Sequence, residues 1–276
     1  MDAMKQVINN VVQQNSMNFP SDQEHVCPHC KRVVPKKEVE IFGKKKLVQP
    51  VCECEAKAAK EEMRRFTEHQ QRKEIERRFS ISALGKRFEE STFDTFIQRE
   101  GSEMAFKQAK KYAFEFDQSG SLSLMLWGTY GNGKSRLAAA VANYLKESGK
   151  TVVFQSVPEL LERIRHTFNK KNAETEQQIM NALLQCDLLI LDDIGAEKVT
   201  DWVNDVLFRV IDGRYRKQLP TFYTSNLKPS ELDGKLGSRI YDRILETSIP
   251  IQNKASSYRR VQAEERFEQF RREMQE

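Results

Sequence analysis

The residues with the most specific chemistry form a glycine-rich stretch in the middle of the chain, Gly128-Thr-Tyr-Gly-Asn-Gly-Lys-Ser135. This is a complete G-x-x-x-x-G-K-S phosphate-binding loop, in which backbone N–H groups point inward at the phosphates of a nucleotide. We expect Lys134 to reach the β- and γ-phosphate oxygens of ATP and the Ser135 hydroxyl to ligate Mg²⁺. The predicted nucleotide-binding residues are Gly128, Thr129, Tyr130, Gly131, Asn132, Gly133, Lys134, Ser135 and Arg136.

A second segment, Leu188-Leu-Ile-Leu-Asp192-Asp193, has the Walker B pattern of an apolar strand that ends in carboxylates. Asp192 is predicted to be the carboxylate partner of Mg²⁺. Asp193, one position later, could orient or deprotonate the water that attacks the γ-phosphate. The alternative for Asp193 is a structural cap on the turn that contains Gly195. With the loop, this segment predicts an ATPase site.

The segment Phe222-Tyr-Thr-Ser-Asn226 places polar side chains at the end of another predicted strand. The Asn226 amide could hold the attacking water and distinguish ATP from ADP. Asn226 could also be a simple turn residue.

Two arginines, Arg239 and Arg243, stand four positions apart, so they share one face of a predicted helix. One of them could reach the γ-phosphate bound by a neighbouring copy of the chain and stabilise charge in the transition state. The alternative is a surface arginine paired with Asp242.

Four of the five cysteines lie between positions 27 and 54, as a C-x-x-C pair followed by a C-x-C pair. In a reducing compartment such pairs indicate metal binding rather than disulfides. The first pair has the spacing of a zinc knuckle, whereas the second is tighter, so His25 or His29 could replace one thiolate. The alternative is a set of free structural thiols. The predicted zinc ligands are Cys27, Cys30, Cys52 and Cys54.

One basic segment of the predicted ATPase core combines positive charge with an aromatic ring, a combination that can hold single-stranded DNA. The spacing of Phe168 favours a place in the core instead, because it continues the apolar face of Leu160 and Ile164. The candidate DNA-binding residues are Arg165, Phe168, Lys170 and Lys171.

The composition and the order of predicted elements restrict the fold. The chain has 276 residues and a formal net charge of +5, too little for the whole molecule to bind nucleic acid through charge alone. No apolar stretch suits a signal peptide or a membrane span, so we expect a cytoplasmic protein without a membrane partner. Alternating strands and helices predict an α/β fold with a parallel sheet, with strands near 121–127, 151–155, 188–191, 221–224 and 247–251.

The sequence also predicts how the chain divides into segments, a capping box and an amphipathic helix. Ser156 and Glu159 are predicted to form a capping box that opens the helix after the second strand. Val261, Phe267, Phe270 and Met274 give the tail an amphipathic helix, expected to pack on its own domain, with a partner helix as the alternative. The expected segments are a flexible lead (1–21), a zinc-binding module (22–56), a charged helical linker (57–87), the ATPase domain (88–256) and the C-terminal amphipathic helix (257–276).

Four motifs together resemble the bacterial and phage DnaC-type helicase loaders over about residues 85–260. They are the phosphate-binding loop, Ile-Leu-Asp-Asp193-Ile-Gly, the Thr-Ser-Asn226 strand end and Gly-Ser-Arg-Ile-Tyr-Asp-Arg243. The cysteine module and the charged helix after it are similar to the N-terminal zinc region of phage and Gram-positive members. The resemblance implies an AAA+ P-loop ATPase, a three-layer sandwich without a full C-terminal lid. Through Ser257-Tyr-Arg259, it also implies an arginine near the nucleotide.

The resemblance further implies a partner, a hexameric DnaB-type replicative helicase that the N-terminal part binds and that the protein delivers to single-stranded DNA. ATP would favour self-association, with Arg239 or Arg243 reaching the neighbour's site, and hydrolysis would release the helicase. Asp193 stands where some members have Glu, which bears on the hydrolysis rate and not on nucleotide binding. Rival interpretations are an IstB-like transposition helper ATPase, a P-loop small-molecule kinase and a zinc-containing adaptor whose nucleotide site is only structural.

Overall fold

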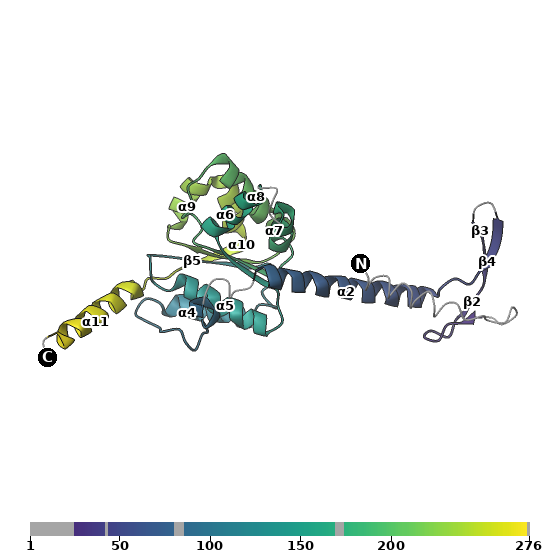
Figure 1. Ribbon diagram of the computed structural model, residues 1–276, viewed down its shortest axis with the longest axis horizontal. Helices are drawn as coiled ribbons and strands as arrows, with labels where there is room; N and C mark the ends of the chain where they lie inside the picture. Colours follow the sequence, from purple (N-terminus) through teal and green to yellow (C-terminus); the bar gives the residue numbers. More distant parts are fainter. Residues whose placement is uncertain (1–24, 42–43, 80–85, 169–173, 275–276) are drawn as a thin grey trace. The chain divides into compact units, whose positions relative to one another are not determined.

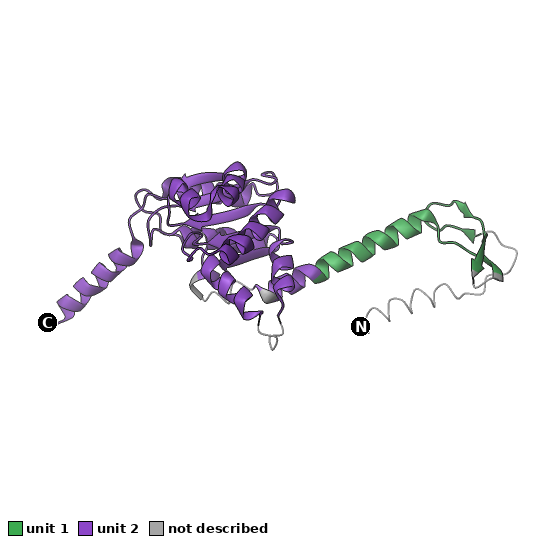
Figure 2. Cartoon of the chain, turned by 90° about the horizontal axis from the view of Figure 1, so that it is seen from above, with its two compact units in different colours: residues 1–70 green, residues 71–276 purple. Residues whose placement is uncertain are grey.

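The structure, a computed structural model, describes residues 25–41, 44–79, 86–168 and 174–274. The predicted lead at 1–21 lies outside the described residues, and so do Lys170 and Lys171. The chain divides into two units, residues 1–70 and residues 71–276 (Figure 2).

The first unit contains two antiparallel hairpins. β1 (His25–Val26) pairs with β2 (Val33–Val34), and β3 (Lys37–Ile41) pairs with β4 (Lys44–Val48). The turn between β1 and β2 and the chain after β4 carry the two cysteine pairs.

Helix α2 (Glu53–Arg78) begins in the first unit and ends in the second. Over most of its length its side chains are exposed, and ion pairs such as Arg64 with Glu61 at 2.6 Å support the helix itself. Near its end, Ile75 and the following Phe79 are only 5% and 2% exposed and belong to the core of the second unit. The end of the predicted linker is therefore part of the core of the second unit.

A parallel sheet of five strands, in the order β6-β7-β8-β5-β9, forms the centre of the second unit. Because all five strands run the same way, their carboxyl ends meet at one edge of the sheet, where such folds bind ligands. The strands are β5 (Ser123–Trp127), β6 (Val152–Ser156), β7 (Leu188–Asp192), β8 (Thr221–Ser225) and β9 (Ser248–Gln252).

Helices cover both faces of this sheet and make three layers (Figure 1). Leu124 and Leu126 of β5 contribute to the core beneath α4 and α5, whereas Met125 between them contributes to the core on the other face. This confirms the predicted AAA+-type sandwich. The helices are α3 (Lys86–Glu89), α4 (Glu103–Phe114), α5 (Lys134–Glu147), α6 (Val157–His166), α7 (Glu176–Leu183), α8 (Asp201–Arg216), α9 (Pro229–Leu236), α10 (Ser238–Thr247) and α11 (Tyr258–Glu273).

Two local predictions are wrong. Ser156 does precede α6, but its hydroxyl makes no capping hydrogen bond, and Pro158 removes one of the two N–H groups that such a hydroxyl accepts from. The tail forms the expected helix α11, but no side chain of that helix is buried, so it does not pack on its own domain.

Every helix among the described residues is too short or too polar to cross a lipid bilayer.

Candidate nucleotide-binding site

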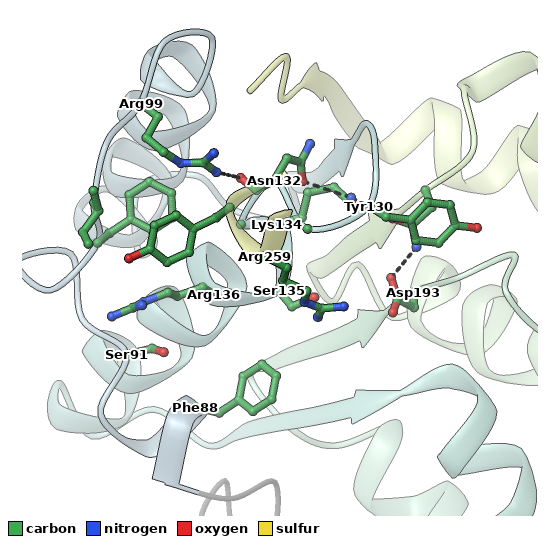
Figure 3. Close-up of a pocket in the computed structure, with 16 residues that line it drawn as sticks. Phe88, Ser91, Arg99, Tyr130, Asn132, Lys134, Ser135, Arg136, Asp193 and Arg259 are labelled. Carbon is green, nitrogen blue, oxygen red and sulfur yellow. Dashed lines mark hydrogen bonds between the residues drawn. The ribbon is translucent and has the colours of Figure 1, made fainter. Parts of the chain in front are cut away.

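A pocket lies at the carboxyl edge of the sheet, where the phosphate-binding loop joins β5 to α5 (Figure 3). The loop residues Tyr130 to Arg136 form one wall of it. The other walls are formed by residues far apart in the sequence, among them Phe88, Arg99, Asp193, Asn226, Tyr258 and Arg259. The structure thus brings the loop, the second Walker B aspartate, the strand-end amide and the arginine of the tail to one place.

The glycines of the loop allow its backbone to turn where a side chain would not fit. Gly128 has a φ of 147°, and a Cβ there would lie 2.3 Å from the carbonyl oxygen of Asn253. Gly133 has a φ of 102° and directly precedes α5. The loop is therefore fixed against the segment after β9 and presents the N-terminus of α5 to the pocket, the arrangement that binds phosphate.

The ammonium of Lys134 is buried at the base of this pocket, and the residue is 4% exposed. It donates to the carbonyl oxygens of Gly128 and Thr129, both at 2.9 Å, and to the side-chain oxygens of Asn132 at 3.1 Å and Asn226 at 2.8 Å. Burial lowers the pKa of Lys134 to about 8, against the attraction of Asp193 and Asp192. Its acceptors are uncharged oxygens, which phosphate oxygens can replace.

Asp192 lies below the pocket surface, 6% exposed, at the end of β7. The Thr224 hydroxyl donates to its carboxylate at 2.6 Å. Burial raises the pKa of Asp192 to about 6, although hydrogen bonds from Thr224 and Ser135 and the charge of Lys134 lower it. Ser135 and Asp192, predicted to hold Mg²⁺ together, thus contact each other, and hydroxyl and carboxylate oxygens are suitable ligands for that ion.

Asp193 has a left-handed backbone, with a φ of 57°, which is uncommon for a residue other than glycine and which is often found at functional sites. Its N–H donates to the Thr224 hydroxyl oxygen at 2.9 Å, and its carboxylate accepts from the Asn226 amide nitrogen at 2.8 Å. Because the Asn226 oxygen accepts from Lys134, this one amide joins the lysine to the aspartate. The simple turn interpretation of Asn226 does not account for these two contacts.

Arg99, which sequence analysis missed, and Tyr258, the middle residue of the Ser257-Tyr-Arg259 motif, hold the tail against the loop. The Arg99 guanidinium donates to the carbonyl of Ser256 at 2.7 Å and lies 5.1 Å from the centre of the Tyr258 ring. The Tyr258 N–H donates to the Gly131 carbonyl at 2.9 Å. No motif in the sequence marks Arg99, because its partners are backbone groups brought near by the fold.

Arg239 and Arg243 are not brought to this pocket, since neither lines it. Both guanidinium groups lie over the Phe208 ring of α8, at 3.7 and 5.0 Å from its centre. Arg243 also donates to the carboxylate of Asp212 at 2.5 Å, so Asp212 takes the place that Asp242 was expected to have.

A second surface feature combines an arginine with two aromatic rings, and we call Arg165, Phe168 and Trp202 the Trp202 patch. Phe168 is 59% exposed, so the core position favoured by its spacing is wrong. Its ring meets that of Trp202 edge to face at 6.0 Å, and the Arg165 guanidinium lies 4.7 Å from the Trp202 ring centre. Trp202, at the start of α8, was missed because it is distant in sequence from the other two.

The four predicted zinc ligands come together in the first unit. The sulfur atoms of Cys27, Cys30, Cys52 and Cys54 all lie within 4.8 Å of one another, and neither His25 nor His29 belongs to the group. A tetrahedral zinc site, with Zn–S near 2.3 Å, separates its sulfurs by about 3.8 Å, so the cluster fits the ion. The backbone N–H and the guanidinium of Arg32 lower the pKa of Cys30 to about 6, which favours a thiolate.

Comparisons with known proteins agree with this geometry. Residues 57–266 match the model of the family described as IstB-like ATP binding protein. A protein of Buchnera aphidicola subsp. Baizongia pistaciae named replicative helicase loader DnaC is 31% identical over 188 residues, 67% of this chain and 76% of that protein.

Two solved structures have the same fold. The crystal structure of the DnaC helicase loader superposes with a TM-score of 0.56 at 23% identity, over 62% of this chain and 100% of that one. That of DnaI superposes with a TM-score of 0.53 at 28% identity, over 60% of this chain and 92% of that one.

The raised pKa of Asp192 predicts how its replacement changes stability. Without nucleotide and Mg²⁺, the folded state keeps the carboxyl proton up to about pH 6, whereas the unfolded chain releases it near 3.8, so Asp192 costs stability as pH rises between these values. Asn cannot ionise but can still accept from Thr224. We expect Asp192→Asn to raise the free energy of unfolding by about 3 kcal/mol near pH 7.5 and to change it by less than about 1 kcal/mol near pH 4.

Urea denaturation in the presence of EDTA at both pH values measures this difference. The matched control is Asp94→Asn, because Asp94 is an exposed carboxyl. Equal stability of Asp192→Asn and the unmodified protein near pH 7.5 would contradict the prediction.

Proposed function

This chain belongs to the IstB-like ATP-binding family, among its DnaC-type helicase loaders, and we propose that it is an ATPase that binds a replicative helicase and delivers it to single-stranded DNA. One observation carries the proposal: the phosphate-binding lysine is joined by Asn226 to Asp193 in a chain whose relatives are named helicase loaders. Such an arrangement can sense whether a γ-phosphate is present.

The proposed chemistry begins when Lys134 exchanges its loop carbonyl acceptors for the β- and γ-phosphate oxygens of ATP. Ser135 and Asp192 would hold Mg²⁺, which would offset the negative charge of the phosphates. Asp193 and the Asn226 amide position the attacking water, with Asp193 as the proton acceptor. Arg259, which lines the pocket, contacts the nucleotide from the tail.

ATP-dependent self-association is the proposed consequence of binding. Arg239 is exposed and Arg243 is held by Asp212, and neither lines the pocket of its own chain. This supports a role in the pocket of a neighbouring copy, where a guanidinium can stabilise the charge that develops on the γ-phosphate. Hydrolysis then weakens the assembly and releases the helicase.

Single-stranded DNA is the proposed ligand of the Trp202 patch. The exposed Phe168 ring and the half-buried Trp202 ring offer stacking surfaces to bases, and the arginine attracts the phosphate backbone. The exposure of Phe168 and the position of Arg165 over Trp202 support this role.

The cysteine module is the proposed contact to the helicase, a hexameric ring of the DnaB type. The cysteine module and the ATP pocket belong to different units of the chain. This supports the proposal that the first unit binds the partner and the second unit hydrolyses ATP. We propose that Zn²⁺ held by its four thiolates folds the module, because so short a segment has little core of its own.

The rival function is that of an IstB-like transposition helper, which would use the same kind of ATP pocket. The relatives that are named helicase loaders favour the loader function over it.

Removing a ring from the Trp202 patch should weaken DNA binding. We expect Phe168→Ala or Trp202→Leu to reduce the affinity for a labelled oligo-dT strand about tenfold, because stacking on one base contributes about 1–3 kcal/mol. Fluorescence anisotropy with saturating Mg·ATP measures the affinity. Phe114→Ala, which removes an exposed ring from α4, is the control. An unchanged affinity in both patch variants would exclude this surface as the DNA site.

The loader function itself is tested by capture of the helicase. The full chain should retain a purified DnaB-type helicase in a pull-down and carry stoichiometric zinc. Cys52→Ser should lose both zinc and helicase while ATP affinity stays within about twofold, because the pocket is in the other unit. If the chain does not bind the helicase but binds a transposase, the loader proposal is wrong and the chain is a transposition helper.

A further inference from the structure

Helix α11 and the residue after it have a row of apolar side chains that no described part of the chain buries. Phe267, Phe270 and Met274 are 61%, 59% and 73% exposed, and no side chain of the helix is buried. Aromatic rings this exposed on neighbouring turns mark an interaction surface. Most of the other side chains of the helix are charged, which excludes a broad apolar face of the kind that packs against a sheet.

The spacing of the row indicates what kind of surface covers it. Ala263, Phe267, Phe270 and Met274 follow one another at intervals of four, three and four residues. This is the a/d pattern of a helix that pairs with another helix along a narrow seam. We call these four residues the α11 seam.

The charges beside the α11 seam indicate which helix pairs with it. Glu264 and Arg271 lie on one side of the seam and Arg266 and Glu273 on the other, as e and g positions do in a coiled coil. The Arg271 guanidinium lies 5.2 Å from the centre of the Phe267 ring, so it does flank the seam.

Two α11 helices placed antiparallel complement each other at all of these positions. In that arrangement Phe267 faces Phe270 of the second copy, Glu264 faces Arg271, and Arg266 faces Glu273. A parallel pair would instead place Arg266 next to Arg271, which is repulsive. The helix is therefore complementary in charge to itself in one orientation only.

We propose that α11 pairs antiparallel with α11 of a second copy of this chain, burying the α11 seam of both. Such a contact is two-fold symmetric and closes at two copies, unlike the head-to-tail contact through which Arg243 would reach a neighbour. It is a binding surface additional to the ATP pocket, and it does not depend on the proposed loader function.

The start of α11 connects this contact to the pocket. The Tyr258 N–H is bonded to the Gly131 carbonyl of the phosphate-binding loop, and Tyr258 and Arg259 line the pocket. With a rise of 1.5 Å per residue, the middle of the seam is about 16 Å along the helix from Tyr258. The paired helices thus join the ATP pockets of two copies by rigid elements, so that a nucleotide in one pocket can influence the contact.

Charge reversal tests both the contact and its orientation. Sedimentation velocity of the full chain, without nucleotide, helicase or DNA, should show a reversible dimer. Glu264→Arg and Arg271→Glu should each weaken it about tenfold, because each places two like-charge pairs in the symmetric contact. The double variant Glu264→Arg/Arg271→Glu should restore the affinity. The controls Glu265→Arg and Arg272→Glu make the same charge changes away from the seam and should have no effect.

A parallel pair would be strengthened by Arg271→Glu, so tighter dimers of that variant would overturn the proposal. A chain that stays monomeric at all accessible concentrations would also overturn it, and so would a dimer that survives Phe267→Asp/Phe270→Asp. Circular dichroism and ATP affinity verify that each variant is folded. No helicase is present in this experiment. Neither a dimer nor a monomer therefore bears on the loader proposal, which is tested by the helicase pull-down.

Discussion

The buried ammonium of Lys134 is the charge on which the ATP pocket depends. Removing it from water is unfavourable, and here four neutral oxygens compensate it, two of them backbone carbonyls of the loop itself. Those carbonyls turn inward because Gly128 and Gly133 have backbone angles open to glycine. A triphosphate is a stronger acceptor for the same cation, so the loop is already arranged for phosphate.

From Lys134 the hydrogen bonds continue to both Walker B aspartates. Asn226 joins the lysine to Asp193, and Thr224 joins Asp193 to Asp192 by accepting from one and donating to the other. Asp192 in turn contacts Ser135, the residue next to the lysine. These bonds join the lysine to residues at the ends of β7 and β8, an arrangement that suits the nucleotide switch proposed above.

Much of this could be predicted from the sequence, because the loop, β7 and β8 are local motifs whose strands end at one edge of the sheet. The left-handed Asp193 and the contact of Arg99 with the tail could not, because they depend on backbone brought together by the fold. The apolar spacing predicted the wrong environment for a side chain whose position depends on tertiary contacts. Phe168 continues the apolar face of α6 in the sequence, but it lies beyond the last buried turn of that helix, beside Trp202. Likewise, α11 has an apolar row that its own domain does not cover.

The affinity of the full chain for Mg·ATP, with and without the Lys134 ammonium, tests the central claim most directly. Isothermal titration of Lys134→Ala should show a loss of at least about a hundredfold, since a charge-assisted contact of about 3 kcal/mol or more is removed from a buried site. The variant should remain folded. Binding of Mg·ATP by Lys134→Ala with the affinity of the unmodified protein would show that the nucleotide is held elsewhere, and would contradict the account.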